Sequence, residues 1–436
     1  MKTIQSHFEV ELFDKKSDWV IFIAICWLIF CISLFMEYSN YKEIKENKTI
    51  SLNAKVLLQY KKIDKNYYVL KLKGENGGTF YTTSKDDLKD LRGRYINIYG
   101  TLGKDCGFKE YLKSCFVVSY AISLLNKKDF RGGIIDYIDS QHSNEFSDKF
   151  DEFSSNLASK MYQGLFLATP MPQSLRDSAN ALNIAHIFAI SGFHLGILAF
   201  VIYFILSPFY KYFQRRYFTY RNEFYDLQFI ILSFSFVYLN VISFSPSFLR
   251  SFVMFAFSFF VLYRGLKLLS FKLLFACILL ILSLFPRVFF SIGFWLSVSG
   301  IFYIYLFLKY IHIKNKLAYI LLLNIIIFLN MFLISHYTFY SFSLWAVLSP
   351  LITLAFVIFY PLVLVLHIIG FGGIFDSFIF FVANYDFAIV EIKTPFWLLV
   401  IFICISFMAI FNKFAYYFIV FLSFLYFLYG ISRGIL

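Results

Sequence analysis

The chain has 436 residues, of which 59% are hydrophobic and only 15% are charged. Together with a mean hydropathy of +0.68, this composition excludes an ordinary soluble globular domain and indicates a membrane protein with several spans. The formal net charge is +13. A basic soluble face suits a polyanion or an anionic lipid surface, although a solvated lysine-rich surface would give the same charge.

The N-terminal part predicts a cytoplasmic segment followed by a membrane anchor. Residues 1–18 are polar, and an apolar run of 18 residues follows from Trp19 to Met36. No small-residue cleavage site follows this run, so we interpret it as a first membrane span and not as a cleaved signal peptide.

Residues 37–125 change to a polar, lysine-rich composition with alternating hydrophobicity. Residues 42–131 hold 19 Lys and Arg against 10 Asp and Glu. Short alternating runs separated by glycines are typical of β-strands, and five of them predict a small, OB-like barrel outside the cytoplasm. The predicted strands are 51–60, 66–74, 77–83, 94–102 and 114–122.

Two of the six cysteines, Cys106 and Cys115, lie in this soluble segment. Their spacing fits a local disulfide, which would require an oxidising compartment, whereas two free thiols remain the alternative. The other four cysteines lie in apolar runs and are interpreted as small core residues.

The rest of the chain predicts an amphipathic helical segment over 126–183 and a transmembrane core over 184–436. The run 342–366 contains Pro350 and Pro361, which predict a broken helix that is re-entrant or crosses twice. The other predicted spans are 184–209, 227–244, 247–264, 271–285, 288–308, 317–335, 396–411 and 415–431.

The connections between these spans predict the topology. Lysine and arginine concentrate in 211–221, 264–272 and 309–316, which the positive-inside rule places in the cytoplasm. The soluble segment 37–183 is then expected outside. Long translocated domains are exempt from this rule, so its basic charge is no contradiction.

The most informative stretch is 175–196, LRDSANALNIAHIFAISGFHLG, which places histidines, a serine and glycines in an apolar run. Such residues at membrane depth usually face a cavity or a path. No HExxH motif and no Asp, Glu or Cys cluster completes a metal site, so no metal is expected. Ser191 and His194 are not expected to hydrogen-bond within one helix, which disfavours a serine protease. Alternatively, His186 and His194 only hydrogen-bond between helices.

Two arginines follow at the predicted outer ends of later spans. Ser245-Pro246 begins one span and places Arg250 about one turn inside it, and Pro286-Arg287 precedes another. With the histidines, these cations would form an outer vestibule that attracts phosphates. The alternative is that both arginines anchor their helices at the interface.

These motifs together resemble the ComEC-type competence family, the inner-membrane channel for transforming DNA. HIFAISGFHLG after Leu175-Arg176 resembles the family's first block. Pro246-Ser247 with Arg250 resembles its second, and Pro286 with Gly293-Phe294 and Leu296-Ser297 its third. The chain departs from the family pattern at Asn183, Phe285 and Trp295, where glycine, an acidic residue and a polar residue are common.

The resemblance implies a channel that carries single-stranded DNA from the periplasm through the inner membrane, with no catalytic residues and no cofactor. It implies as partners a periplasmic DNA-binding competence protein, a cytoplasmic helicase-like motor and single-strand-binding proteins. The expected path residues are His186, Ser191, Gly192, His194, Gly196, Arg250, Arg287, Gly293 and Ser297. The expected DNA-binding residues of the outer domain are Lys61, Lys62, Tyr67, Tyr68, Tyr81, Arg92 and Arg94.

Longer family members carry a C-terminal metallo-β-lactamase-like nuclease domain. This sequence contains no HxHxDH motif, so a separate nuclease is expected, and no GxxxxGK[ST] motif, so energy must come from elsewhere. Two other functions remain open. One is a membrane enzyme for a lipid-linked or peptide substrate that uses Ser191, His186 and His194, and the other is a small-anion transporter that uses the same cations.

Overall fold

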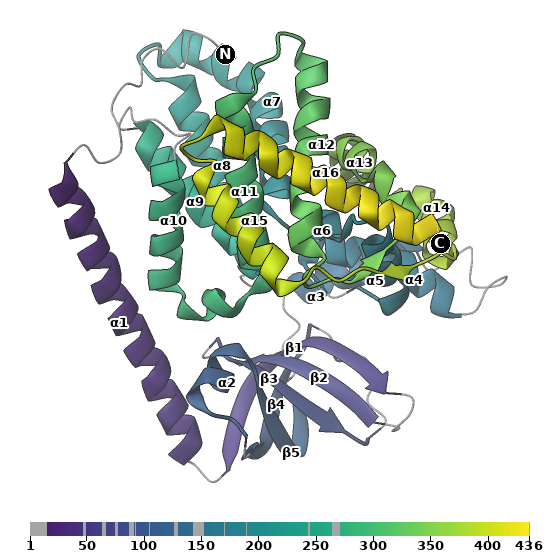
Figure 1. Ribbon diagram of the computed structural model, residues 1–436. Coiled ribbons are helices and arrows are strands. Elements are labelled where there is room, and N and C mark those ends of the chain that lie inside the picture. The colour runs from purple at the N-terminus through teal and green to yellow at the C-terminus, as the bar shows by residue number, and fades with distance from the viewer. Residues whose placement is uncertain are drawn as a thin grey trace.

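The computed structural model describes most of the chain. The described residues are 15–46, 49–62, 67–74, 77–86, 91, 93–103, 105–125, 130–142, 152–169, 171–188, 190–242, 245–263 and 271–435, without the side chains of 60–62, 152–156, 246–247, 262–263 and 435. In Figure 1 a β-barrel lies below a helical domain, and one long N-terminal helix runs past both.

The barrel confirms the five predicted strands. They are β1 (Ile50–Lys62), β2 (Tyr67–Gly74), β3 (Thr79–Ser84), β4 (Tyr95–Leu102) and β5 (Cys115–Leu125), and they close in the order β1-β2-β3-β5-β4. All pairs are antiparallel except β3 with β5. Inward-facing apolar residues such as Leu70, Leu72, Ile96 and Ile98 are fully buried and fill the interior.

One glycine of the barrel is required by a close approach of two backbones. At Gly100 the β4–β5 register shifts. A Cβ atom there would lie 2.2 Å from the carbonyl oxygen of Val118. Only glycine fits such a bulge without moving the neighbouring strand. The short helix α2 (Phe108–Lys113) then connects β4 to β5.

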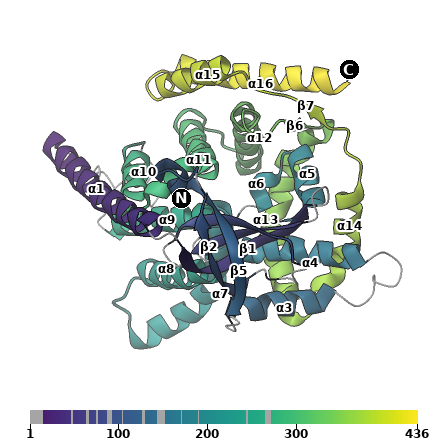
Figure 2. The ribbon, with the colours of Figure 1, turned by 90° about the horizontal axis from the view of Figure 1, so that it is seen from below.

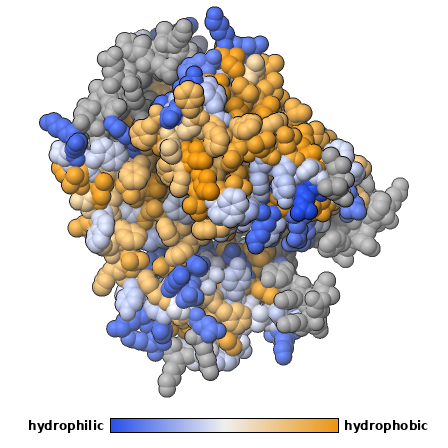
Figure 3. All heavy atoms as spheres, viewed as in Figure 1, coloured by the Kyte–Doolittle hydropathy of each residue, from blue (hydrophilic) through white to orange (hydrophobic). Residues whose placement is uncertain are grey.

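The helical part is that of a polytopic membrane protein. Seven helical segments of the described chain are long and apolar enough to cross a membrane: those in α1 (Lys16–Glu46), α7 (Gly192–Tyr217), α8 (Glu223–Val241), α11 (Ile292–Tyr310), α12 (Lys316–Ser335), η4 with α13 (Leu344–Ile369) and α16 (Lys413–Ile435). Shorter apolar helices lie in α9 (Pro246–Tyr263), α10 (Phe271–Leu284), η5 with α14 (Gly372–Asn384) and α15 (Phe396–Met408). Apolar side chains cover much of the helical face shown in Figure 3, as lipid contact requires.

Two spans differ from the sequence prediction. The run 184–209 is not one helix: α6 (Ala185–Phe188) is separated from α7, which begins at Gly192. The run 342–366 is not broken at Pro361, because α13 (Ser349–Ile369) continues through that residue. Pro350 lies in the first turn of α13, where its missing N–H leaves no bond unmade.

The segment between barrel and membrane helices forms α3 (Phe130–His142), α4 (Glu152–Leu167) and α5 (Gln173–Ala181). Three phenylalanines of the predicted amphipathic segment cannot be assigned to a face, because Phe146, Phe150 and the side chain of Phe153 lie outside the described residues. The second half of α4 is buried and shares an apolar core with α7, α13 and α14. Seen from the barrel side in Figure 2, α3 and α4 lie beside α13 and α14, and α15 and α16 lie along another edge.

Candidate functional site

The HIFAISGFHLG motif folds as a break between two helices. Asn183, just before α6, has a φ of 53°. Asparagine tolerates this left-handed conformation better than most residues, and glycine tolerates it best. The departure from the family's glycine at this position therefore preserves the local backbone. After α6, the chain passes through Ser191 in an extended conformation and enters α7.

Ser191 and His194 form the N-terminal cap of α7. The Ser191 hydroxyl accepts a hydrogen bond from the backbone N–H of Phe193 at 3.3 Å. The backbone N–H of Ser191 donates to Nδ1 of His194, also at 3.3 Å. The Ser191 Oγ also lies 3.4 Å from that Nδ1, a contact that was not expected for two residues within one helix. They meet because Ser191 precedes the helix, where a side chain can fold back onto the first turn.

His194 faces the protein interior. Its side chain is buried, and its ring lies edge-on against Phe356 and Tyr360 of α13, with centroid distances of 5.3 and 4.8 Å. His186, in contrast, is exposed. The two histidines therefore lie in different surroundings, one packed and one accessible.

The two glycines of the motif also differ. Gly192 packs against α9, because a Cβ atom there would lie 3.0 Å from the Ser251 hydroxyl. Gly196 is exposed, and no atom lies within 4 Å of the position of its missing Cβ. Gly192 thus allows two helices to approach, whereas Gly196 borders open space.

Arg250 joins α9 to the start of α11. Its guanidinium is almost fully buried, donates from Nη1 to the carbonyl of Gly293 at 2.9 Å, and lies 5.7 Å from the ring centroid of Phe294. Gly293 is exposed at the first turn of α11, and Ser297, one turn later, is half-buried. The second and third motif blocks therefore meet in space. Phosphate contact by Arg250 stays a prediction.

Arg287 lies in η3 (Pro286–Phe290), between α1 and the barrel. It donates from Nε and Nη2 to the two carboxylate oxygens of Glu37 at 2.7 and 2.6 Å, and its guanidinium lies 4.9 Å from the ring centroid of Tyr111. Burial alone would lower the pKa of Arg287, but the bonds to Glu37 outweigh burial and raise it. Contact of Arg287 with DNA stays a prediction, and in this structure its charge is neutralised by Glu37.

The part of the chain that contains the three motif blocks is similar in sequence to a known family. The family model for the competence protein matches residues 168–431, which is more than half of the chain and includes all three blocks. The chain belongs to the competence protein family. No curated protein and no solved structure matches it.

Outside the matched region, the predicted DNA-binding residues of this competence family member lie on the barrel. Tyr67, Tyr68 and Tyr81 are half-buried and Arg94 is exposed. Lys71 lies 5.6 Å from the ring centroid of Tyr81. The side chains of Lys61 and Lys62, and all of Arg92, lie outside the described residues. The sulfurs of Cys106 and Cys115 form a disulfide, with 5.6 Å between the Cα atoms.

The structure adds an aromatic face that the sequence reasoning missed. Tyr99 on β4 and Phe116 and Tyr120 on β5 point outward and are 46%, 44% and 63% exposed. The rings of Tyr99 and Tyr120 lie 6.4 Å apart, and the Tyr120 hydroxyl lies 3.2 Å from Thr101 Oγ1. The alternation in the fifth predicted strand was the available signal, because Phe116, Val118 and Tyr120 occupy the face opposite to buried Cys115 and Val117.

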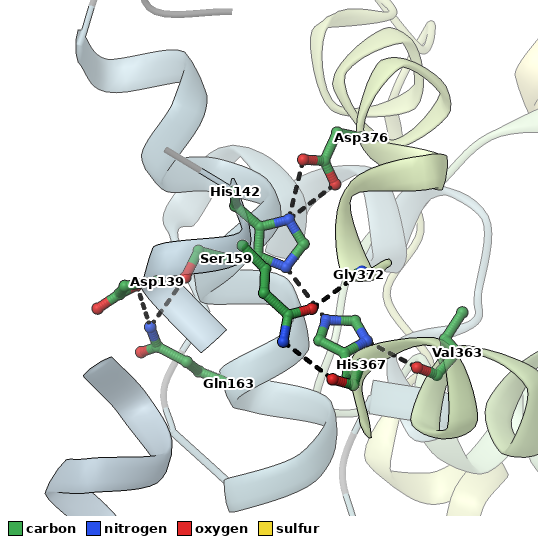
Figure 4. A network of polar contacts seen from close by, with 9 residues as sticks. Asp139, His142, Ser159, Gln163, Val363, His367, Gly372 and Asp376 are labelled. Atoms are coloured by element: carbon green, nitrogen blue, oxygen red, sulfur yellow. Dashed lines mark hydrogen bonds and ion pairs between the residues drawn. The ribbon is translucent and has the colours of Figure 1, made fainter. Parts of the chain in front are cut away.

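A polar cluster on the barrel side of the helical domain was also missed. His142 of α3 lies between Asp376 of α14 and His367 of α13 (Figure 4). Next to it, Gln163 of α4 donates to Asp139 at 2.7 Å, and Ser159 donates to the same carboxylate. No group of three or more His, Cys, Asp or Glu side chains in the described part of the chain could hold a metal ion. No short-range sequence signal indicates the cluster, since His142 lies 234 residues from Asp376 and 225 residues from His367.

Proposed function

We propose that this competence family member is the inner-membrane channel that carries single-stranded transforming DNA from the periplasm into the cytoplasm. The observation that carries this proposal is the family match over a core whose signature motif forms a break just before the membrane helix α7 and exposes small and polar residues. A broken helix at membrane depth is tolerated where it is buried in protein or lines a water-filled cavity.

The barrel would receive the DNA first. Its closed five-stranded form with a crossover between β3 and β5 supports an OB-like domain. Single strands are bound without sequence preference by aromatic rings that stack bases and by cations that meet phosphates. Tyr99, Phe116 and Tyr120 supply exposed rings, and Lys71 beside Tyr81 supplies a cation on the neighbouring strands.

The strand would then pass the break before α7. His186, Gly192 and Gly196 are exposed there, and Gly293 is exposed at the start of α11, which the buried Arg250 orders. Small residues with few fixed charges suit a path, because a strand held strongly at one point could not move on. Energy, in this proposal, comes from a cytoplasmic helicase-like motor or from capture by single-strand-binding proteins. A periplasmic DNA-binding protein delivers the DNA, and a separate nuclease removes the other strand.

The first test is DNA uptake in cells that lack this gene. Fluorescent double-stranded DNA is followed by microscopy and transformants are counted in the same culture. We expect DNase-protected foci to accumulate in the periplasm while transformants disappear. Undiminished transformation in the deletion strain would rule out the channel.

Variants of the aromatic face extend the same assay. Tyr99→Leu with Tyr120→Leu keeps apolar bulk but removes the rings, and Tyr99→Phe with Tyr120→Phe keeps the rings. We expect only the leucine pair to reduce transformation, because stacking requires an aromatic ring. If the two pairs of substitutions had the same effect on transformation, the aromatic face of the barrel would not bind DNA by stacking.

One observation favours a second candidate. The 3.4 Å distance between Ser191 Oγ and His194 Nδ1 is compatible with a membrane enzyme that uses Ser191 as a nucleophile. Substitutions of Ser191 separate the two functions and are argued in the Discussion.

A further inference from the structure

The polar cluster around His142 joins four helical elements on the barrel side of the helical domain (Figure 4). His142 is the last residue of α3 and its side chain is completely buried, whereas the Asp376 carboxylate at the start of α14 is 19% exposed. Gln141, next to it, donates to the carbonyl of His367 and accepts from the N–H of Gly372. The end of α3 is therefore fastened to the turn between α13 and α14.

Three consecutive contacts form a chain through the two imidazoles. Asp376 lies 2.9 Å from Nδ1 of His142, Nε2 of His142 lies 3.1 Å from Nε2 of His367, and Nδ1 of His367 lies 2.6 Å from the carbonyl oxygen of Val363. Each contact is a hydrogen bond only if it contains one hydrogen. A backbone carbonyl can only accept, so Nδ1 of His367 must carry the last of the three.

Counting these hydrogens shows that one proton is missing when both histidines are neutral and Asp376 is ionised. Two neutral imidazoles carry one hydrogen each and an ionised carboxylate carries none, which gives two hydrogens for three contacts. With only two, either two lone pairs face each other between the histidines, or the Asp376 carboxylate faces a bare nitrogen. A third hydrogen satisfies all three contacts and makes the net charge of the chain zero.

We propose that this cluster is a proton-binding site: one proton, shared between Asp376 and His142, closes the hydrogen-bonded chain and fastens α3 to the α13–α14 turn. In its charge-separated form the site is an imidazolium beside a carboxylate. Such a buried pair is stable only when its remaining hydrogen bonds are satisfied, as they are here through His367.

The surroundings support a positive charge on His142. The ring of Tyr162 in α4 stacks on the imidazole at 5.0 Å and 17°, which places an aromatic face against it. Burial, and then the charge of Asp376, raise the pKa of the Tyr162 phenol, so this group stays neutral. The other nearby carboxylate, Asp139 on α3, already accepts hydrogen bonds from Ser159 and Gln163. Asp376 is therefore the partner of the shared proton.

The fastened turn is connected to the signature motif. His367 lies near the end of α13, and Phe356 and Tyr360 of the same helix contact His194 at the start of α7. The bound proton thus fixes the helix on which the motif rests. Because the barrel continues directly into α3, it also fixes where the barrel is attached.

Asp376→Asn provides the test, because an amide can donate a hydrogen of its own. Its N–H can donate to Nδ1 of a neutral His142, whose Nε2–H then donates to His367, so three hydrogens are present without a bound proton. Thermal unfolding of the full-length protein in detergent is measured between about pH 7 and pH 8.5, above the ordinary histidine pKa of about 6.5. Asp386→Asn, an exposed acid in the following loop, is the matched control for loss of charge.

In this pH range the unfolded wild-type chain has a neutral histidine and an ionised aspartate, so folding must take up the proton. We therefore expect the melting temperature of the wild-type protein, relative to Asp376→Asn, to fall as the pH rises. Asp386→Asn should follow the wild-type curve. His142→Phe keeps a ring that can stack but has no nitrogen atoms. It should be less stable than the wild-type protein and Asp386→Asn at every pH.

Parallel curves for wild type and Asp376→Asn would overturn the proposal. It would also be overturned if a chelator lowered the wild-type melting temperature and elemental analysis found one metal ion per chain, because the two imidazoles would then share a metal.

If Asp376→Asn or His142→Phe cannot be purified folded, the pH dependence is measured by hydrogen exchange in the wild-type protein and in Asp386→Asn. The protection factors of the α3 amides, corrected for the intrinsic rise of the exchange rate with pH, must then decrease as the pH rises. Unchanged protection factors would overturn the proposal. None of these outcomes bears on DNA uptake.

Discussion

At the scale of the residue, Ser191 shows that a side chain's role depends on where its helix begins. The sequence pattern places Ser191 and His194 in one apolar run, where they are not expected to hydrogen-bond to each other. Because α7 begins at Gly192, Ser191 becomes the cap and His194 the third residue of the first turn. Capping of α7 therefore accounts for the contact between Ser191 and His194, and no catalytic role is needed to explain it.

This role makes a prediction for Ser191→Ala and Ser191→Asn. Alanine cannot accept the hydrogen bond from Phe193, and the loss of a cap costs about 1 kcal/mol. Asparagine can cap but cannot act as a nucleophile. We expect alanine to lower the melting temperature and reduce transformation in part, and asparagine to retain more of both. If both variants abolish function while remaining fully stable, Ser191 acts as a nucleophile and the second candidate function, a membrane enzyme, is correct.

At the scale of the element, most helices follow from the length of their apolar runs. The predicted spans 271–285 and 317–335 agree with α10 and α12 to within a residue or two at each end. The break before Gly192 and the continuity at Pro361 could not be predicted, because both depend on neighbouring helices. A proline inside a membrane helix is accommodated when packing satisfies the freed backbone groups, and the sequence does not show that packing.

The two glycines at the start of α7 give the prediction for this scale. Gly192→Ala would place a Cβ atom 3.0 Å from the Ser251 hydroxyl, and overpacking of this kind costs about 1–3 kcal/mol. Adding Ser251→Ala removes the hydroxyl and leaves an ordinary contact of 3.5 Å to its Cβ. We expect the double variant to regain melting temperature that Gly192→Ala loses, as measured in detergent.

Gly196 is the matched control on the same helix. Gly196→Ala meets no atom within 4 Å and should be neutral or stabilising by about 0.5–1 kcal/mol. Gly196→Leu should remain folded but reduce transformation if this open side belongs to the DNA path. Normal transformation by a stable Gly196→Leu protein would place the path elsewhere.

At the scale of the whole molecule, the contacts that join its parts could not be predicted at all. The Glu37–Arg287 pair joins residues 250 positions apart, and the His142–Asp376 pair joins residues 234 positions apart. No periodicity links such residues, since each one looks like an isolated polar group in its own segment. What the sequence does predict at this scale is the side of the membrane, through the charge of the loops.

The disulfide turns that topology into a prediction. If the barrel lies in the periplasm, Cys106 and Cys115 are oxidised in living cells, because thiols in the cytoplasm are kept reduced. Cells are treated with an alkylating reagent that adds mass to free thiols, before and after reduction, in a variant whose other four cysteines are replaced by serine. We expect the reagent to modify two thiols per chain, and only after reduction.

Topology is the point on which the proposed direction of transport depends. A barrel in the cytoplasm would leave both thiols free without reduction, and it would place the aromatic face of β4 and β5 at the exit of the path. Tyr99 and Tyr120 would then bind a strand that has already crossed, and the basic loops would lie outside, against the positive-inside rule. A single thiol assay therefore decides whether the barrel can receive DNA before it reaches the membrane.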